Sequence, residues 1–195
     1  MIIYSIVKSI LWVFFKAVFF VRCEGKENIP KTGGVIVSAN HQSNFDPPIV
    51  GSFLTRSLKF MAKKELFKSK IGNWFLTTIG AFPVDRGGSD IGVLKTSIKL
   101  LKEENAICIF PEGTRKCKDI NQVKSGAVMF AIKAQVPILP VGIAGGYKPF
   151  KPMKIVFGKP VYYTEYYDKK VTQEELHELS VQLMKDIYAL ADVNK

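Results

Sequence analysis

The chain has 195 residues, a formal net charge of +11 at pH 7, and a composition that is 47% hydrophobic and 23% charged. This composition excludes an intrinsically disordered chain, and the length predicts one globular domain with a short appendage. Most of the excess positive charge lies in residues 1–70, which favours a polyanionic partner such as an anionic membrane surface, a phosphorylated substrate or nucleic acid.

Residues 1–22 predict an amphipathic helix that lies in the plane of a membrane. The segment has three basic residues and no acidic residue, and most of the others are Ile, Leu, Val and Phe. On a helix its polar side falls within an arc of roughly 100° and consists of Ser5, Lys8, Ser9, Trp12 and Lys16. We expect the lysines to reach lipid headgroups and the Phe-rich side to enter the acyl region.

Three other interpretations of this segment stay open. A spanning helix of about 20 residues would be only just long enough and would place lysines in hydrocarbon. A signal peptide would need a positive side chain before Lys8 and a small-residue cleavage site, which the sequence does not show. The third alternative is a helix packed on the domain. We therefore divide the chain into residues 1–22, a membrane-anchoring helix, and residues 23–195, a globular domain.

Strands and helices alternate along the rest of the chain. The expected strands cover residues 35–39, 58–62, 81–86, 106–110, 136–144 and 154–161. One expected helix begins at Pro47–Pro48, with Asp46 near its N-cap. Three further helices are expected at residues 87–104, 125–135 and 172–191. This alternation predicts an α/β fold with a mixed, mostly parallel sheet flanked by helices. The three cysteines lack CxxC spacing and predict neither a disulfide framework nor a zinc site, and Cys108 is expected in the core.

His41 is one of two histidines in the chain and follows the expected strand 35–39. Turn-forming residues precede Asp46, so its carboxylate can fold back onto the imidazole. Asp46 would then accept a hydrogen bond from one ring nitrogen, and the other nitrogen would act as a general base. The alternative is a pair that only holds the loop. The sequence has no G-x-S-x-G motif, so the base would activate a hydroxyl group carried by the substrate.

Two arginines follow other expected strands. The segment "FPEGTR", residues 110–115, places an acid, a glycine, a hydroxyl and Arg115 in one turn, whose backbone N–H groups and guanidinium can bind phosphate. The segment "AFPVDR" places Arg86 at the end of another strand. We expect the two arginines to converge on one anion, with a surface ion pair as the alternative for each. The second histidine, His177, lies among glutamates of the last helix and is interpreted as a surface residue.

Four segments, "NHQSNFD", "GAFPVDR", "FPEGTR" and "VPILPVGI", resemble in order and spacing the motif blocks of the glycerolipid acyltransferase family, and within it the bacterial lysophosphatidate acyltransferases. The resemblance covers about residues 23–165. It implies a glycerol-3-phosphate acyltransferase-like fold for the domain. It also implies transfer of a fatty acyl group from acyl-CoA or acyl-carrier protein to the 2-hydroxyl of lysophosphatidic acid, which forms phosphatidic acid in phospholipid synthesis without a metal or cofactor.

The resemblance also assigns roles to residues. It implies that His41 is the catalytic base and Asp46 its partner, and that Arg86 contacts the phosphate of the acceptor. It assigns acceptor binding to Glu112, Gly113, Thr114 and Arg115. Lys124 matches a basic residue often found after the third block, and could bind phosphate or face solvent. Lys116 departs from the family pattern, in which serine is common.

The implied partners are a membrane phospholipid surface, lysophosphatidic acid, and acyl-CoA or acyl-carrier protein, with no nucleic acid. The implied location is the cytoplasmic face of the cell membrane, as a monotopic or peripheral protein. Alternatives are acyl transfer to glycerol-3-phosphate or another lysolipid, a phospholipid or thioester hydrolase, and a non-catalytic membrane- or nucleic-acid-binding protein. The lysines and aromatic residues of 63–80 could contact headgroups, border an acyl tunnel or form an ordinary amphipathic helix.

Overall fold

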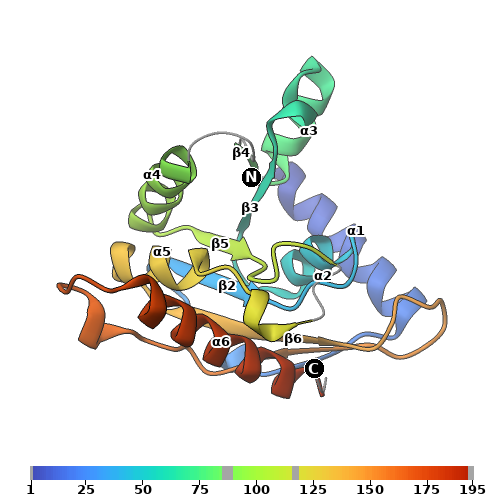
Figure 1. Cartoon of the computed structure of the whole chain (residues 1–195). Helices are drawn as coiled ribbons and strands as arrows, with labels where there is room; N and C mark the ends of the chain where they lie inside the picture. The colour runs from blue at the N-terminus through green and yellow to red at the C-terminus, as the bar shows by residue number, and fades with distance from the viewer. Residues whose placement is uncertain (1, 85–89, 116–118, 193–195) are drawn as a thin grey trace.

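The computed structural model describes residues 2–84, 90–115 and 119–192. Its centre is a seven-stranded sheet with the order β1-β7-β6-β2-β5-β3-β4 (Figure 1). The strands are β1 (Arg22–Glu24), β2 (Val35–Ala39), β3 (Leu58–Lys63), β4 (Ala81–Val84), β5 (Ala106–Ile109), β6 (Ile138–Ala144) and β7 (Lys154–Phe157). The sheet determines where the loops that follow each strand lie, and these loops carry the polar motifs.

The strand directions confirm the predicted mixed, mostly parallel sheet. Strands β6, β2, β5, β3 and β4 are mutually parallel, β7 runs antiparallel to β6, and β1 is parallel to β7. All five residues of the central strand β2 are buried. Strands covered on both faces have continuous apolar sequences, as "VIVSA" does. The segment that leads to His41 is therefore a fixed central element of the fold.

Helices cover both faces of the sheet, as expected (Figure 1). They are α1 (Ile2–Phe19), α2 (Asp46–Phe53), α3 (Lys70–Thr78), α4 (Asp90–Lys102), α5 (Gly126–Ala134) and α6 (Gln173–Leu190), with short 3-10 turns at Lys26–Asn28, Lys64–Phe67, Ile120–Gln122 and Thr164–Tyr166. Helices α1 and α2 contribute to one apolar core, and α4, α5 and α6 to the other. Helix α6 begins with the predicted capping box of Thr172 and Glu175.

Two details of the fold differ from the sequence-based expectation. Strand β1 was not expected; it pairs with β7, and Arg22 lies opposite Lys154. Asp46 is the first residue of α2, and the N-cap position belongs to Phe45. The Asp46 carboxylate accepts hydrogen bonds from the preceding backbone N–H groups of Gln42 and Ser43. It therefore fixes the loop that enters the helix.

The orientation of α1 also differs from expectation. Lys8 was expected to reach lipid headgroups, but its ammonium group is partly buried and donates a hydrogen bond to the backbone carbonyl of Leu54, just after α2. Phe15 and Phe19, expected in the acyl region, are buried against the domain. The expectation was wrong for these residues because the partner of the helix is α2, which contacts α1 along this side.

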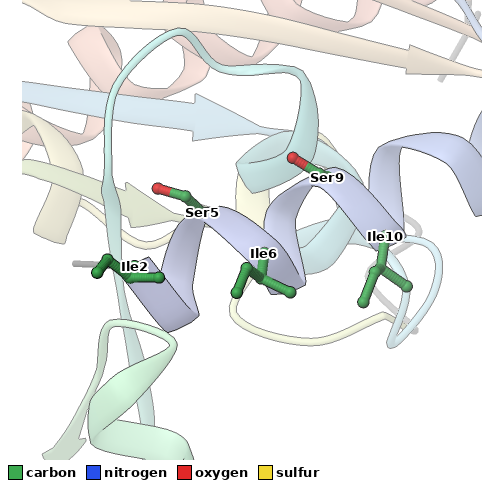
Figure 2. Close-up of a pocket in the computed structure, with 5 residues that line it drawn as sticks. All are labelled: Ile2, Ser5, Ile6, Ser9 and Ile10. Carbon is green, nitrogen blue, oxygen red and sulfur yellow. The ribbon is translucent and has the colours of Figure 1, made fainter.

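The opposite side of α1 is apolar and exposed. Figure 2 shows Ile2, Ile6 and Ile10 pointing outward along one side of the helix, while Ser5 and Ser9 point to another. All three isoleucines are exposed, as are Ile3, Val13 and Phe14. By length and composition α1 is apolar enough to cross a membrane. In this structure, however, only one side of it is available to lipid.

Candidate active site

The motifs of His41 and Glu112 lie together with Tyr147 at the carboxyl edge of the parallel strands. His41 follows β2, the loop 110–115 follows β5, and Tyr147 follows β6, and β2 lies between β5 and β6 in the sheet. Open α/β sheets bind ligands at this edge because the loops after adjacent strands lie together there. The sheet thus brings three segments that are far apart in sequence into one site.

Asp46 is the central buried group of the site. Its side chain is 0% exposed. One carboxylate oxygen, Oδ2, lies 2.7 Å from Nδ1 of His41 and also accepts the backbone N–H groups of Gln42 and Ser43, each at 2.7 Å. The other oxygen accepts the hydroxyl of Tyr147 at 2.7 Å. The predicted contact between His41 and Asp46 is confirmed, and four donors hold the carboxylate in place.

Tyr147 connects this carboxylate to the N-terminal helix. Its ring packs edge-on against Phe19 of α1, with centroids 5.7 Å apart, and lies tilted against Phe45, with centroids 5.5 Å apart. Burial, together with the negative charge of Asp46, raises the pKa of Tyr147 above its usual value. The phenol therefore stays protonated and keeps donating to Asp46 throughout the physiological pH range.

His41 is oriented on two sides. Its ring stacks on Phe110, with centroids 4.3 Å apart and planes 24° from parallel. Because a carboxylate only accepts hydrogen bonds, Nδ1 carries the proton that is donated to Asp46. The neutral ring then has its lone pair on Nε2, and the side chain is 19% exposed. This is the arrangement of a general base with its orienting carboxylate.

Glu112 supports the backbone of the same loop. Its carboxylate is 2% exposed and accepts the backbone N–H of His41 at 2.5 Å and the hydroxyl of Tyr188, on α6, at 2.5 Å. Asn40 exchanges two hydrogen bonds with the backbone of Ile143 in β6. Acceptor binding by Glu112 stays a prediction. The hydrogen bond from the backbone N–H of His41 shows that Glu112 also holds His41 in position.

The remaining residues of the third motif are accessible. Gly113, Thr114 and Arg115 are exposed, and Gly113 has a φ of +65°, a conformation that favours glycine. The stem of Lys124 lies against Gly113, and its backbone N–H donates to the carbonyl of Pro111 at 2.7 Å. Arg115 and Lys124 thus belong to one exposed basic loop region. Arg86 lies outside the described residues, so its convergence with Arg115 stays a prediction.

A buried thiol lies beneath the site. Cys108 in β5 is buried, as predicted, and burial, followed by the charge of Asp46, raises the pKa of its thiol. A thiol with a raised pKa is protonated at neutral pH and is a poor nucleophile. Its role is therefore packing.

Three aromatic residues of the site were not expected from the sequence: Tyr147, Tyr188 and Phe110. Tyr147 follows the Gly145–Gly146 pair after the fourth motif, and this turn signal at the end of a strand could have indicated it. Phe110 is the first residue of the third motif and could have been assigned to the site with it. Tyr188 lies on the last helix, and the sequence carries no signal that connects it to Glu112.

Comparison with known proteins identifies relatives of this chain. The family model described as "Acyltransferase" matches residues 20–144. The chain is 38% identical to the 1-acyl-sn-glycerol-3-phosphate acyltransferase of Bacillus subtilis over 152 residues, which are 75% of this chain and 76% of that protein. It is 31% identical to the Streptococcus pneumoniae protein of the same name over 82% of this chain and 61% of that protein.

A solved structure shows the same architecture. The crystal structure of the 1-acyl-sn-glycerophosphate (LPA) acyltransferase PlsC from Thermotoga maritima has a TM-score of 0.71 and 29% identity, and the match covers 98% of this chain and 81% of that chain. Fold and site thus define an acyl-transferring enzyme. The chain belongs to the Acyltransferase family, and the class and the fold implied by the four motifs are confirmed.

Proposed function

We propose that the protein transfers a fatty acyl group from acyl-CoA or acyl-carrier protein to the 2-hydroxyl of lysophosphatidic acid, which forms phosphatidic acid. The observation that carries this proposal is the His41–Asp46 pair, 2.7 Å apart, beside the exposed basic loop of Arg115. The name of the Bacillus subtilis relative, 38% identical over three quarters of this chain, supports the acceptor.

The chemistry follows from the arrangement of His41. Its Nε2 takes the proton of the acceptor hydroxyl as the oxygen attacks the carbonyl carbon of the thioester. Asp46 stabilises the imidazolium that forms. When the tetrahedral intermediate collapses, the C–S bond breaks and the sulfur leaves with the proton from His41. One ester forms and one thioester is lost, so the reaction as proposed needs neither an acyl-enzyme intermediate nor a metal or cofactor.

Helix α1 supports a location at the membrane surface. Because α1 packs on α2 and presents its isoleucines on the other side, we assign it to the bilayer surface rather than to a span. Phe19 of α1 contacts Tyr147, which donates to Asp46, so the lipid-facing helix lies directly behind the active site. We assign this surface to the cytoplasmic face of the cell membrane, where the acyl donors are.

Product analysis tests the proposed reaction. With oleoyl-CoA and lysophosphatidic acid we expect one phosphatidic acid for each thiol released. Release of free fatty acid without loss of the acceptor would instead show a hydrolase. Running the same reaction with an acyl-carrier protein donor identifies the donor.

Arg115→Ala tests the assignment of the acceptor phosphate. Loss of a charge-assisted hydrogen bond to phosphate costs about 1.5–3 kcal/mol, so we expect the KM for lysophosphatidic acid to rise about 10- to 100-fold. The kcat should change little. Lys133→Ala, which removes an exposed cation from α5, is the matched control. An unchanged KM in Arg115→Ala would place the phosphate elsewhere.

Tyr147→Phe tests the hydrogen bond to Asp46. The ring and its contacts with Phe19 and Phe45 are kept, and only the donor is lost. We expect kcat to fall about 10-fold with little change in either KM, and the free energy of unfolding to fall by about 1–3 kcal/mol. Steady-state kinetics and thermal unfolding measure the two effects. Tyr162→Phe, at an exposed position, should change neither, and a full kcat in Tyr147→Phe would remove Tyr147 from the positioning of Asp46.

A further inference from the structure

Helix α3 and the turn before it form an apolar surface with no cover in the described structure. None of the nine residues of α3, all of them described, is buried. Ile71 is 81% exposed and Trp74 is 59% exposed, and Leu66 and Phe75 are exposed as well. Single exposed apolar residues are ordinary, but a cluster of large ones marks an interaction site. We call Leu66, Ile71, Trp74 and Phe75 the α3 surface.

Three residues of the α3 surface share one side of the helix, and the fourth, Leu66, lies in the 3-10 turn before it. Ile71 lies three residues before Trp74 and four before Phe75, so these side chains are neighbours on a helical surface. In Figure 1, α3 projects away from the sheet instead of lying flat on it. Its apolar side is therefore available to a partner over its whole length.

Four lysines lie in the segment that leads into α3. Lys63, Lys64, Lys68 and Lys70 are all exposed, and Glu65 is the single acid between residues 63 and 70. Exposed lysines beside Trp, Phe, Ile and Leu suit an anionic bilayer, whose headgroups attract the cations while the apolar residues enter the acyl boundary. A second copy of the chain fits poorly, because it would bring two lysine clusters together.

The base of α3 lies beside the N-terminal end of α1. Tyr4, in the first turn of α1, accepts the backbone N–H of Leu58 at 2.8 Å, and its ring lies beside Gly80, two residues after α3. Figure 1 shows the N-terminal end of α1 next to the base of α3. A bilayer is broad enough to take both helices at once.

We propose that the α3 surface is a second membrane-docking site, specific for anionic phospholipid. The inference rests on the proposed placement of α1 at the membrane. With two helices in contact with lipid, the domain is held on the bilayer at two separate places instead of along α1 alone. Residues 63–80 thus contact headgroups and acyl chains, and are not an ordinary amphipathic helix on the domain.

Tryptophan fluorescence tests the docking site directly. The chain has two tryptophans, so Trp12→Phe leaves Trp74 as the only one. With vesicles of phosphatidylglycerol and phosphatidylcholine, we expect a blue shift of the Trp74 emission and quenching by brominated acyl chains. Vesicles of pure phosphatidylcholine should give a much smaller response. Vesicle binding by the protein without a change in Trp74 emission would overturn the proposal.

A flotation experiment provides the second measurement. We expect the double variant Ile71→Ser/Trp74→Ser to bind anionic vesicles about tenfold or more weakly. Tyr162→Ser, which removes an exposed aromatic residue far from α3 in sequence, should bind as the unchanged protein does. Circular dichroism checks that the variants fold.

Two results would assign the α3 surface to another partner and overturn the proposal. One is a dimer in ultracentrifugation that the double variant loses, and the other is binding of acidic carrier protein, without lipid, that the double variant loses. Because both vesicle assays measure binding, a protein that docks but transfers no acyl group would contradict the proposed function and leave this inference standing.

Discussion

His41→Ala reduces acyl transfer by about 10²- to 10⁴-fold, the usual contribution of a general base. Alanine removes Nε2, the nitrogen assigned to the proton of the acceptor hydroxyl. It leaves the Asp46 carboxylate with three of its four donors, Gln42, Ser43 and Tyr147. The loop therefore keeps its anchor, and thermal unfolding and vesicle binding should be preserved. Initial rates of thiol release in the presence of acceptor measure the effect.

His177→Ala is the matched control for this variant, because it removes the only other histidine, which lies partly buried on α6. We expect full turnover. If His41→Ala kept more than about a tenth of the rate, far above the range for a lost base, the assignment of the base would be wrong.

Asp46→Asn has the second large effect. The amide has nearly the shape of the carboxylate, so its oxygen can still accept the N–H groups of His41, Gln42 and Ser43. The hydroxyl of Tyr147 can turn and accept from the new NH₂ group, because a hydroxyl both donates and accepts. The fold is thus kept, and what the variant removes is the negative charge that stabilises the imidazolium.

For Asp46→Asn we expect kcat to fall by about 10²- to 10⁴-fold, the larger value being the loss known for the corresponding change in serine proteases. Thermal unfolding run in parallel separates this loss from unfolding. Asp168→Asn, at an exposed carboxylate that accepts from Gln135, is the control. A kcat near that of the unchanged protein would mean that the charge of Asp46 has no part in the reaction.

The local part of the site could be predicted from the sequence. His41 and Asp46 are five residues apart, and the turn residues between them are sufficient to indicate the contact, which the structure shows at 2.7 Å. The buried strand β2 follows in the same way from an unbroken apolar segment. In both cases the neighbours in sequence decide the structure.

The distant part of the site could not be predicted from such patterns. Tyr147 is 101 residues from Asp46, and Glu112 is 71 residues from the backbone N–H that it accepts. These contacts depend on the order of the strands, which places β5 and β6 on the two sides of β2. The third motif indicates Glu112 as a site residue. Its contacts with His41 and Tyr188 can be seen only in the folded structure.

The orientation of helix α1 likewise could not be predicted from the sequence. The sequence predicts its length and apolar character, but it also predicts that the lysines of the polar arc reach lipid headgroups. Lys8 instead donates to a carbonyl 46 residues away, at Leu54. A helical projection finds a polar side without identifying its partner, and the tertiary contact decides the orientation. Strand β1 was missed for a related reason, because its three residues owe their structure to pairing with β7.

An acceptor panel tests the central claim most directly. Purified protein in anionic vesicles receives oleoyl-CoA or an acyl-carrier protein donor, with lysophosphatidic acid, with glycerol-3-phosphate or without an acceptor, and thiol release and lipid product are measured together. We expect phosphatidic acid with lysophosphatidic acid only, in equal amount to the thiol. Thiol release without an acceptor, or acylation of glycerol-3-phosphate alone, would contradict it.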